Sequence, residues 1–292
     1  MKGILIFIML VILTSQINCS QDSNKIFKVM TFNIRYGTAK DSLNSWPYRR
    51  DILVDCLKKN KPDILATQEA LDFQVDFIRE AFPAWKSFGV GRYYHVTVPD
   101  RPQESGNGES CSILYDSTKF RLIRQGTYWH SDTPDVPGSI TWGNSLARIT
   151  TWGIFQENSG GKDFVVMNTH FHSGEPYVTN TTDLIISKWQ EIAAGRPSIL
   201  VGDFNLDPAS PTHQRFCANG PGQPNFIDCW QALSMPETDA ATSHGFDGST
   251  SRSRIDWILV TPEIGVQNIK IIHDNLDGRY PSDHYPVMAE LY

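Results

Sequence analysis

The sequence predicts an α/β sandwich, in which two β-sheets face each other and helices cover their outer surfaces. The first observation behind this prediction is a strand, helix, strand pattern in the first half of the chain, which starts again in the second half. The second is that the 292 residues contain no internal repeat, low-complexity tract or long linker, and this length suits one large domain. We therefore expect one folded domain over residues 26–292.

The first half of the chain alternates between extended and helical patterns. Its first helix carries Pro47 in the first turn, where proline is tolerated, and its apolar residues fall on one face. The run from Ile64 to Thr67 is short and apolar, as in a buried strand. The elements expected here are a strand at 26–33, a helix at 47–60, a strand at 64–67, a helix at 72–82 and a strand at 112–115.

The second half repeats this alternation. A helix at 182–194, with apolar residues at helical spacing, separates two apolar strands. The segments 85–111 and 126–148 are irregular and rich in glycine, proline and aromatic residues, so we expect them to shape a substrate entrance. The strands expected in this half are 164–169, 199–202, 255–260 and 287–291.

The N-terminus has the pattern of an export signal. Lys2 precedes an uninterrupted apolar run from Ile4 to Leu13, which is too short for a bilayer span of about 20 residues. We predict a secretory signal peptide over residues 1–19 and hence a secreted protein. A lipoprotein anchored at Cys19 is the alternative.

Four cysteines follow the leader: Cys56, Cys111, Cys217 and Cys229. An even number in an exported chain permits disulfides. Cys217 and Cys229 are close together in a segment rich in glycine and proline, so they are the expected pair. Four free thiols are the alternative.

Short polar segments recur at the ends of apolar runs. Aspartate and asparagine are poor strand formers, so this placement does not serve a core. It gathers oxygen ligands and histidines around one point, which suits a divalent cation such as Mg²⁺ and a phosphate. The segments are Thr31-Phe32-Asn33, Gln68-Glu69, Asn168-Thr169-His170, Gly202-Asp203-Phe204-Asn205, Arg254-Ile255-Asp256 and Ser282-Asp283-His284.

The residue types indicate hydrolysis of a phosphoester, which needs a cation, a base and a group that stabilises the leaving oxygen. Glu69 is the best metal ligand, with Asn33 and Asp283 beside it, although a Glu at this position could instead cap the following helix. Asp203 would orient the attacking water or bind metal and Asn205 would hold a phosphate oxygen, unless they only form an Asx-turn.

Two histidines complete this prediction. His284 needs a partner that fixes its tautomer, and Asp256 is the natural candidate for an acid–base pair. His170, at the end of its own strand, would polarise the phosphate, although such a histidine can also be purely structural. The net charge of −6 gives no general attraction to nucleic acid, and the spacing shows no zinc site, nucleophile elbow or phosphate loop.

Together these segments resemble the endonuclease/exonuclease/phosphatase superfamily, from Thr31-Phe32-Asn33 to Ser282-Asp283-His284. The resemblance implies a four-layer α/β sandwich and a Mg²⁺-dependent phosphoester hydrolase, with Mn²⁺ as a possible substitute. By motif position it implies metal at Asn33, Glu69 and Asp283. It further implies that His170, Asp203 and Asn205 handle phosphate and water, and that Asp256 orients His284.

The chain is most similar to exported members of this superfamily, with differences that bear on the substrate. His172 stands where those members carry an acidic residue, and Tyr93-Tyr94-His95 replaces a short acidic turn. We expect a monomeric phosphodiesterase or nuclease-like enzyme without a stable protein partner, acting on nucleic acid, a nucleotide or another soluble ester. The alternatives are a sphingomyelinase-like enzyme, for which Tyr93-Tyr94 would dock a phospholipid head group, a phosphomonoesterase, and a non-catalytic binding protein.

Overall fold

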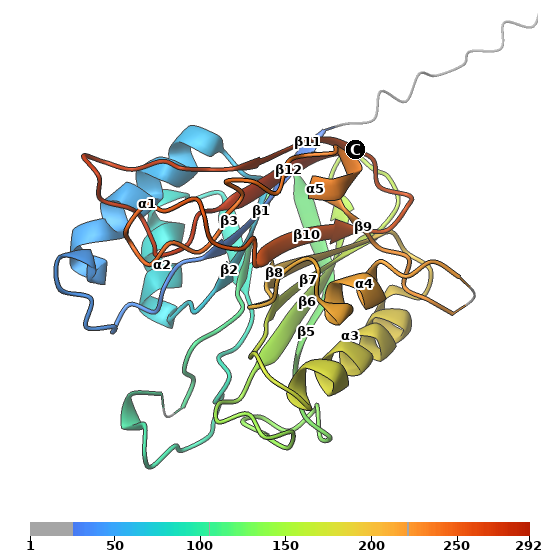
Figure 1. Cartoon of the computed structure of the whole chain (residues 1–292), viewed down its shortest axis with the longest axis horizontal. Helices are drawn as coiled ribbons and strands as arrows, with labels where there is room; N and C mark the ends of the chain where they lie inside the picture. Colours follow the sequence, from blue (N-terminus) through green and yellow to red (C-terminus); the bar gives the residue numbers. More distant parts are fainter. Residues whose placement is uncertain (1–25, 105, 221) are drawn as a thin grey trace, which may run out of the picture.

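The computed structural model describes residues 26–104, 106–220 and 222–292, and it confirms the α/β sandwich (Figure 1). Two six-stranded mixed sheets stack face to face. The first sheet has the order β11 (Val266–Ile271), β12 (Val287–Leu291), β1 (Phe27–Asn33), β2 (Ile64–Gln68), β4 (Ile113–Asp116) and β3 (Trp85–Phe88). The second has the order β5 (Phe120–Trp129), β6 (Ile149–Glu157), β7 (Phe164–His170), β8 (Ser198–Asp203), β10 (Asp256–Val260) and β9 (Ile227–Asp228).

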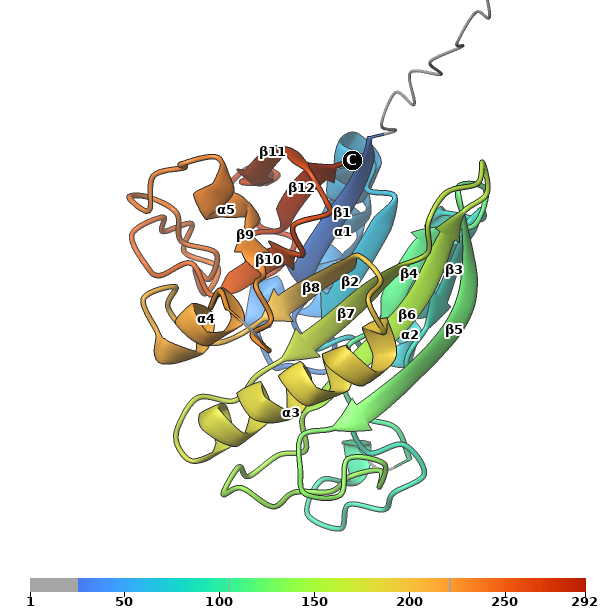
Figure 2. The same ribbon diagram turned by 90° about the vertical axis from the view of Figure 1, so that its right-hand side faces the viewer.

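Helices cover the outer face of each sheet and complete four layers (Figures 1 and 2). The first sheet is covered by α1 (Trp46–Asn60) and α2 (Asp72–Ala81), and the second by α3 (Tyr177–Ala193) and α4 (Pro211–Phe216). Three short helices, η1 (Ser42–Asn44), η2 (Pro102–Glu104) and α5 (Cys229–Ala232), lie in connections. Among the described residues, no helix has both the length and the apolar character needed to cross a membrane.

Alternation along the strands builds the layers. In β1, Val29 packs between the two sheets, whereas its neighbour Met30 packs against the helices. In β8, Val201 faces the first sheet and Leu200 faces α3. Successive strand residues point to opposite faces, so a strand with apolar residues at every position joins two cores. Burying each such side chain contributes about 1.5–3 kcal/mol.

The expected elements are all present, and their ends agree within one residue except at α3. This helix begins at Tyr177 instead of residue 182. The sequence prediction started it too late because Thr181 and Thr182 are poor helix formers, which here lie buried inside the helix. The hydroxyl of Thr182 donates to the Val178 carbonyl oxygen at 2.7 Å, which satisfies it inside the helix.

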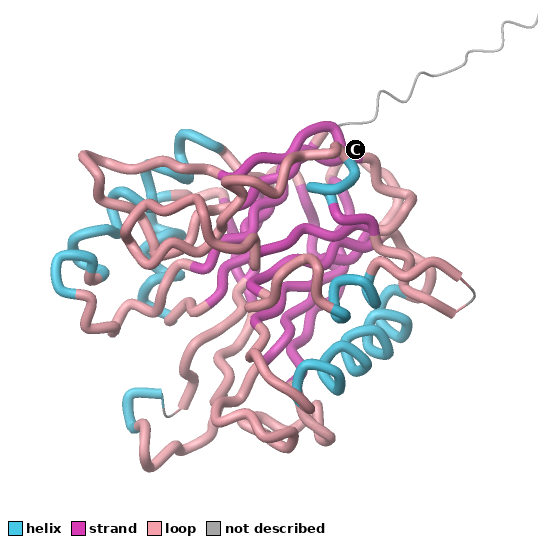
Figure 3. The backbone as a smooth tube through the Cα atoms, viewed as in Figure 1, coloured by secondary structure: helices cyan, strands magenta, loops and turns pink. Residues whose placement is uncertain are grey.

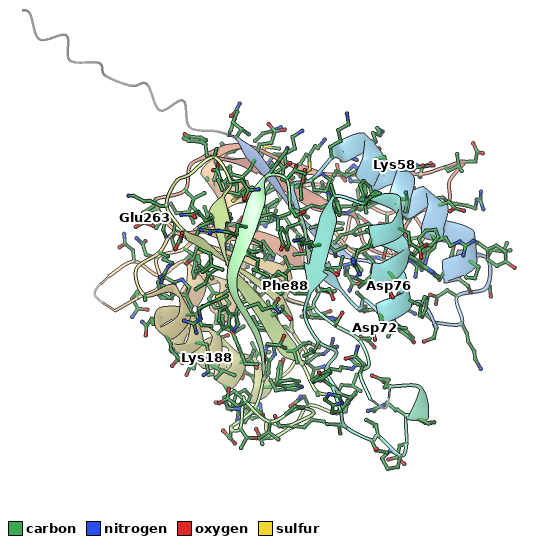
Figure 4. All side chains as sticks on the ribbon, turned by 180° about the vertical axis from the view of Figure 1, so that it is seen from behind. Lys58, Asp72, Asp76, Phe88, Lys188 and Glu263 are labelled. Atoms are coloured by element: carbon green, nitrogen blue, oxygen red, sulfur yellow. The ribbon has the colours of Figure 1, made fainter. Side chains whose placement is uncertain are left out.

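Five strands have no counterpart in the sequence prediction, namely β3, β5, β6, β9 and β11. Glycines explain why β5 and β6 were not predicted, because glycine disfavours a strand locally. A Cβ on Gly126 would lie 2.8 Å from the Trp152 ring, and one on Gly153 would lie 2.6 Å from Phe88, which reaches over from β3 (Figure 4). Large rings of neighbouring strands therefore occupy the space above both glycines.

The expected disulfide between Cys217 and Cys229 is wrong, since all four cysteines of the described chain are free. Cys229 packs in the core between the sheets, whereas Cys217 packs on the outer side of the second sheet with α3. A sheet thus separates the two sulfurs. The predicted signal peptide and the alternative anchor at Cys19 lie outside the described residues.

A buried ionic cluster holds the edge of the second sheet. Asp228 accepts from Arg254 Nη2 and from His213 Nε2, each at 2.8 Å, and its side chain is 0% exposed. Arg254 also pairs with Glu237 at 2.8 Å. This cluster fixes β9 and the residues that lead into β10.

Candidate active site

The register of the strands brings the polar ends of both sheets to one place. In the second sheet, His170 pairs with Asp203 across β7 and β8, and Asp203 pairs with Asp256 across β8 and β10. In the first sheet, Asn33 pairs with Gln68 across β1 and β2. Paired residues on neighbouring strands project to the same face about 5 Å apart. All five side chains therefore point into the space between the sheets.

Asn33 links the two sheets directly. Its Nδ2 donates to Asp203 Oδ2 at 3.0 Å and to Glu69 Oε1 at 3.3 Å. Its Oδ1 accepts from the backbone N–H of Arg35 at 3.0 Å, which leaves one lone pair on that oxygen. Asn33 thus orients two carboxylates through its amide nitrogen.

A buried amide pair lies beneath this link. Gln68 Nε2 donates to Asn168 Oδ1 at 2.7 Å, and Asn168 Nδ2 donates to the carbonyl oxygens of Thr67 and Ser112 at 2.9 and 3.0 Å. A different alignment of β2 against β7 would break these buried hydrogen bonds, so the pair favours the alignment observed. The positions of the catalytic side chains above it follow from that alignment.

Glu69 follows β2 in a left-handed backbone conformation, with φ of 57°. Its carboxylate accepts from Asn33 Nδ2 and from the backbone N–H of Tyr36 at 3.1 Å. The helix-cap alternative is excluded, because the N-terminus of α2 is closed by Leu71 and Gln74, whose Oε1 accepts from Leu71 N–H. Glu69 instead belongs to the site.

Asp283 completes an acidic group with Glu69. Ser282 Oγ donates to the Asn33 carbonyl oxygen at 2.7 Å and ties this segment to the end of β1. Burial raises the pKa of Asp283, His284 opposes the rise and the charge of Glu69 adds to it. Two partly desolvated carboxylates that repel each other, with the amide oxygen of Asn33 beside them, fit a hard divalent cation.

His284 and Asp256 form the expected pair. His284 Nδ1 lies 2.9 Å from Asp256 Oδ2, and its Nε2 lies 3.9 Å from Asp203 Oδ2. Burial alone would lower the pKa of His284, but the neighbouring carboxylates Asp256 and Asp203 outweigh burial and raise it to about 10. His284 is therefore an imidazolium at neutral pH. Asp256 is itself held through its backbone N–H, which donates to Thr242 Oγ1 at 3.0 Å.

Asp203 lies at the centre of the site. Burial raises its pKa, and the charge of Asp256 adds to this effect while His284 opposes it. Its Oδ1 accepts from the Asn205 backbone N–H at 2.9 Å, so the Asx-turn is present, while Oδ2 faces Asn33 and the histidines. A Cβ on the preceding Gly202 would lie 2.0 Å from the Thr169 carbonyl oxygen, which explains the glycine.

His170 contacts Arg148, a residue that the sequence prediction missed. Its Nε2 lies 3.4 Å from Asp203 Oδ2, and Arg148 Nη1 lies 2.7 Å from its Nδ1. Burial lowers the pKa of His170 well below its usual value, and Arg148 lowers it further. The ring is therefore neutral, with Nδ1 accepting from Arg148 and the proton on Nε2. His172 lies apart from this group, with its ring against Tyr177.

Glu109 is a second residue without a predicted role. Its carboxylate, that of Glu69 and a ring nitrogen of His170 lie within 4.8 Å of one another. Arg92 donates to both carboxylate oxygens of Glu109, at 3.1 and 2.7 Å. Burial still raises the pKa of Glu109. Glu109 lies in an irregular segment, so no strand end marks it as a site residue.

Fold and site together define a hydrolase of phosphate esters, and comparison with known proteins identifies its family. The chain belongs to the Endonuclease/Exonuclease/phosphatase family, whose model matches residues 30–284. Members of this family hydrolyse phosphoesters and generally depend on a divalent metal.

Three relatives illustrate the similarity. The structure of an endonuclease/exonuclease/phosphatase from Bacteroides vulgatus is 32% identical, with a TM-score of 0.81 over 92% of this chain and 99% of that one. A mannosyl-6-phosphatase from Bacteroides thetaiotaomicron is 30% identical, with a TM-score of 0.79 over 91% of this chain and 99% of that one. Uncharacterized protein L388 of Acanthamoeba polyphaga mimivirus is 30% identical over 188 residues, or 62% of this chain and 67% of that protein.

Proposed function

We propose that this protein is an exported, Mg²⁺-dependent phosphoester hydrolase of the phosphodiesterase type. One observation carries the proposal. The Asp256–His284 pair and Asp203 of one sheet meet the acidic group of Glu69 and Asp283, and Asn33 links the two sets.

In this proposal Glu69 and Asp283, with Asn33 beside them, hold Mg²⁺ or Mn²⁺. When bound, the metal supplies positive charge to the phosphoryl oxygens. The oxygen donors of these side chains match the preference of Mg²⁺, which needs only one or two carboxylates from the protein. Arg35, whose Nε lies 3.7 Å from Asp283 Oδ2, neutralises part of the remaining negative charge.

The other side chains act on water and phosphate. Asp203 is buried and has a raised pKa, so its Oδ2 is suited to accept a proton from the attacking water. The His284 imidazolium, held by Asp256, donates to phosphoryl oxygen as negative charge develops there. His170 offers its Nε2 proton to the same group, and Asn205 lies two residues beyond Asp203 on the same turn.

A phosphomonoesterase is the second candidate, and a specific similarity favours it. The mannosyl-6-phosphatase of Bacteroides thetaiotaomicron aligns with nearly the whole described chain. Of the tyrosine pair behind the lipid alternative, Tyr94 is 38% exposed, but Tyr93 is only 3% exposed and its hydroxyl accepts from the Ala147 backbone N–H at 3.2 Å. A buried ring cannot dock in a membrane.

Export and assembly state are proposals as well. A signal peptide over residues 1–19 would deliver the enzyme outside the cytoplasm as a monomer, and Cys19 would provide a lipid anchor in the alternative. Sequencing the N-terminus of the mature protein separates these two routes.

The test of the proposed function compares bis-p-nitrophenyl phosphate with p-nitrophenyl phosphate, in Mg²⁺, in Mn²⁺ and in EDTA. We expect hydrolysis to need a divalent metal and to be lost in His284→Ala. His95→Ala, which changes an exposed histidine outside the site, is the matched control and should keep full activity. Metal-independent hydrolysis, or equal activity of the two variants, would refute the proposed mechanism.

A further inference from the structure

We propose that Arg148 binds the substrate phosphate in a narrow subsite and gives the enzyme a preference for terminal, dianionic phosphate esters. This inference rests on the metal-dependent ester hydrolysis of the proposed function and concerns the ester class that the same site accepts. It replaces the first candidate named above, a phosphodiesterase, with the second, a phosphomonoesterase.

Arg148 has hydrogen-bonding capacity that the protein does not use. Its Nη1 donates to His170 Nδ1 at 2.7 Å, and its Nε is buried without a partner. Across the described ranges, no carboxylate lies within the 4 Å of an ion pair with this guanidinium. A buried donor without a partner costs free energy, so the remaining N–H groups are explained by an anion that binds there.

Arg92 lines the same space as Arg148, but its guanidinium has acidic partners. Its guanidinium is satisfied by Glu104, at 2.5 and 2.8 Å, and by Glu109. Both carboxylates form ion pairs with Arg92, so the charges of Arg92 and its partners offset each other. Arg148 is thus the arginine of this subsite that has no acidic partner.

The subsite beside His170 is narrow. The space lined by Glu69, Arg92, Glu109, Arg148 and His170 measures about 10 Å³, the size of one water molecule. A space of this size can receive one phosphate oxygen but has no room for a second ester group.

Two packed loops make this wall rigid. The segments 89–104, 106–111 and 130–148 extend beyond the ends of the sheets (Figure 3) and contribute to a small apolar core. Tyr93, Trp129 and Ala147 meet in this core, and Trp129 Nε1 donates to the Arg92 carbonyl oxygen at 2.6 Å. Because the loops are packed on each other, widening this space would mean breaking this core.

The chemistry of the guanidinium matches a terminal phosphate. A monoester has three non-bridging oxygens and is mostly dianionic at neutral pH, since its second pKa is about 6. Arginine binds two oxygens of such a group at once through its planar fork. A diester has only two non-bridging oxygens and one charge, so it cannot satisfy both the metal side and Arg148 equally well.

Three variants test this inference, with p-nitrophenyl phosphate and bis-p-nitrophenyl phosphate as substrates and inorganic phosphate as the binding probe. Arg148→Gln removes the charge, Arg148→Lys keeps it without the fork, and Arg124→Gln is the matched control on the exposed face of β5. Calorimetric titration of phosphate provides a readout that is independent of turnover.

We expect the wild-type enzyme to prefer the monoester. In Arg148→Gln, kcat/KM for the monoester should fall about 10- to 100-fold, whereas that for the diester should change by less than about threefold. The Kd of phosphate should rise by the same 10- to 100-fold, with Arg148→Lys in between. Arg124→Gln should match the wild type in every measurement.

Two results would overturn the inference. Preference of the wild-type enzyme for the diester would show that the subsite is not closed to a second ester group. An equal loss on both esters without weaker phosphate binding would show that Arg148 acts only by orienting His170. Neither result touches the proposed metal-dependent hydrolysis, which fails instead if EDTA or His284→Ala leaves hydrolysis of both esters intact.

Discussion

The substitution Asp228→Asn tests the buried ionic cluster at the edge of the second sheet. It keeps the size of the side chain and removes its charge from between Arg254 and His213, each of which lies 2.8 Å away. An amide nitrogen would then face N–H donors, and the guanidinium would lose its fully buried partner. Removing one member of a buried pair costs about 3–5 kcal/mol. Glu237, 49% exposed, still contacts Arg254, so we expect about 3 kcal/mol.

The expected loss depends on pH with a definite sign. Burial raises the pKa of Asp228, but the hydrogen bond from His213 and the charge of Arg254 outweigh burial and lower it. A carboxylate with a depressed folded pKa stabilises the protein above its unfolded pKa of about 3.9. That contribution is lost as the pH falls through the folded value. The difference between wild type and variant should therefore be constant near neutrality and shrink below about pH 4.

Thermal unfolding at pH 7 and at pH 3 measures both effects. A loss of about 3 kcal/mol corresponds to a Tm lowered by roughly 6–12 °C in a domain of this size. Asp183→Asn, which breaks the exposed pair with Arg215, is the control and should cost less than about 1 kcal/mol. If Asp228→Asn lowers the Tm no more than this control, the cluster does not stabilise the sheet edge as argued.

Three further substitutions address the site. Asp203→Ala should abolish hydrolysis, with at least about a 10³-fold loss of kcat and an unchanged circular dichroism spectrum, and retained turnover would remove it from the mechanism. Glu69→Gln should raise the Mg²⁺ concentration for half-maximal rate, and an unchanged metal titration would exclude Glu69 as a ligand. Gly202→Ala places a Cβ 2.0 Å from the Thr169 carbonyl oxygen, so its Tm should fall by roughly 2–12 °C, from a cost of about 1–3 kcal/mol. A wild-type Tm would contradict that contact.

The sequence predicted the elements whose residue pattern follows directly from their burial. Apolar runs such as Ile64 to Thr67 form buried strands, and the polar residue that ends each run lies at the rim of a sheet. The strands β5 and β6 escaped prediction because Gly126 and Gly153 weaken the local strand pattern. The rings that explain these glycines, Trp152 and Phe88, come from other strands and are brought there only by folding.

The site residues also divide into those that a sequence pattern marks and those that it does not. Residues at strand ends, such as Asn33, Asp203 and His284, could be predicted because a motif marks them, and the structure places them together. Arg148 and Glu109 lie in irregular segments where no periodicity distinguishes them. The pairing of Cys217 with Cys229 failed because closeness along the chain says nothing of which side of a sheet each sulfur occupies.

The position of β12 has a consequence for the time at which the enzyme becomes active during synthesis. This strand pairs with β1 on one side and with β11 on the other, and it follows Asp283 and His284 along the chain. Until β12 has been made, β1 has an open edge of unpaired backbone groups, which favours association with other chains. The pairing that closes this edge also brings Asp283 to Asn33 and His284 to Asp256. The same C-terminal segment of the chain therefore completes both the site and the first sheet, so a nascent chain acquires the two together.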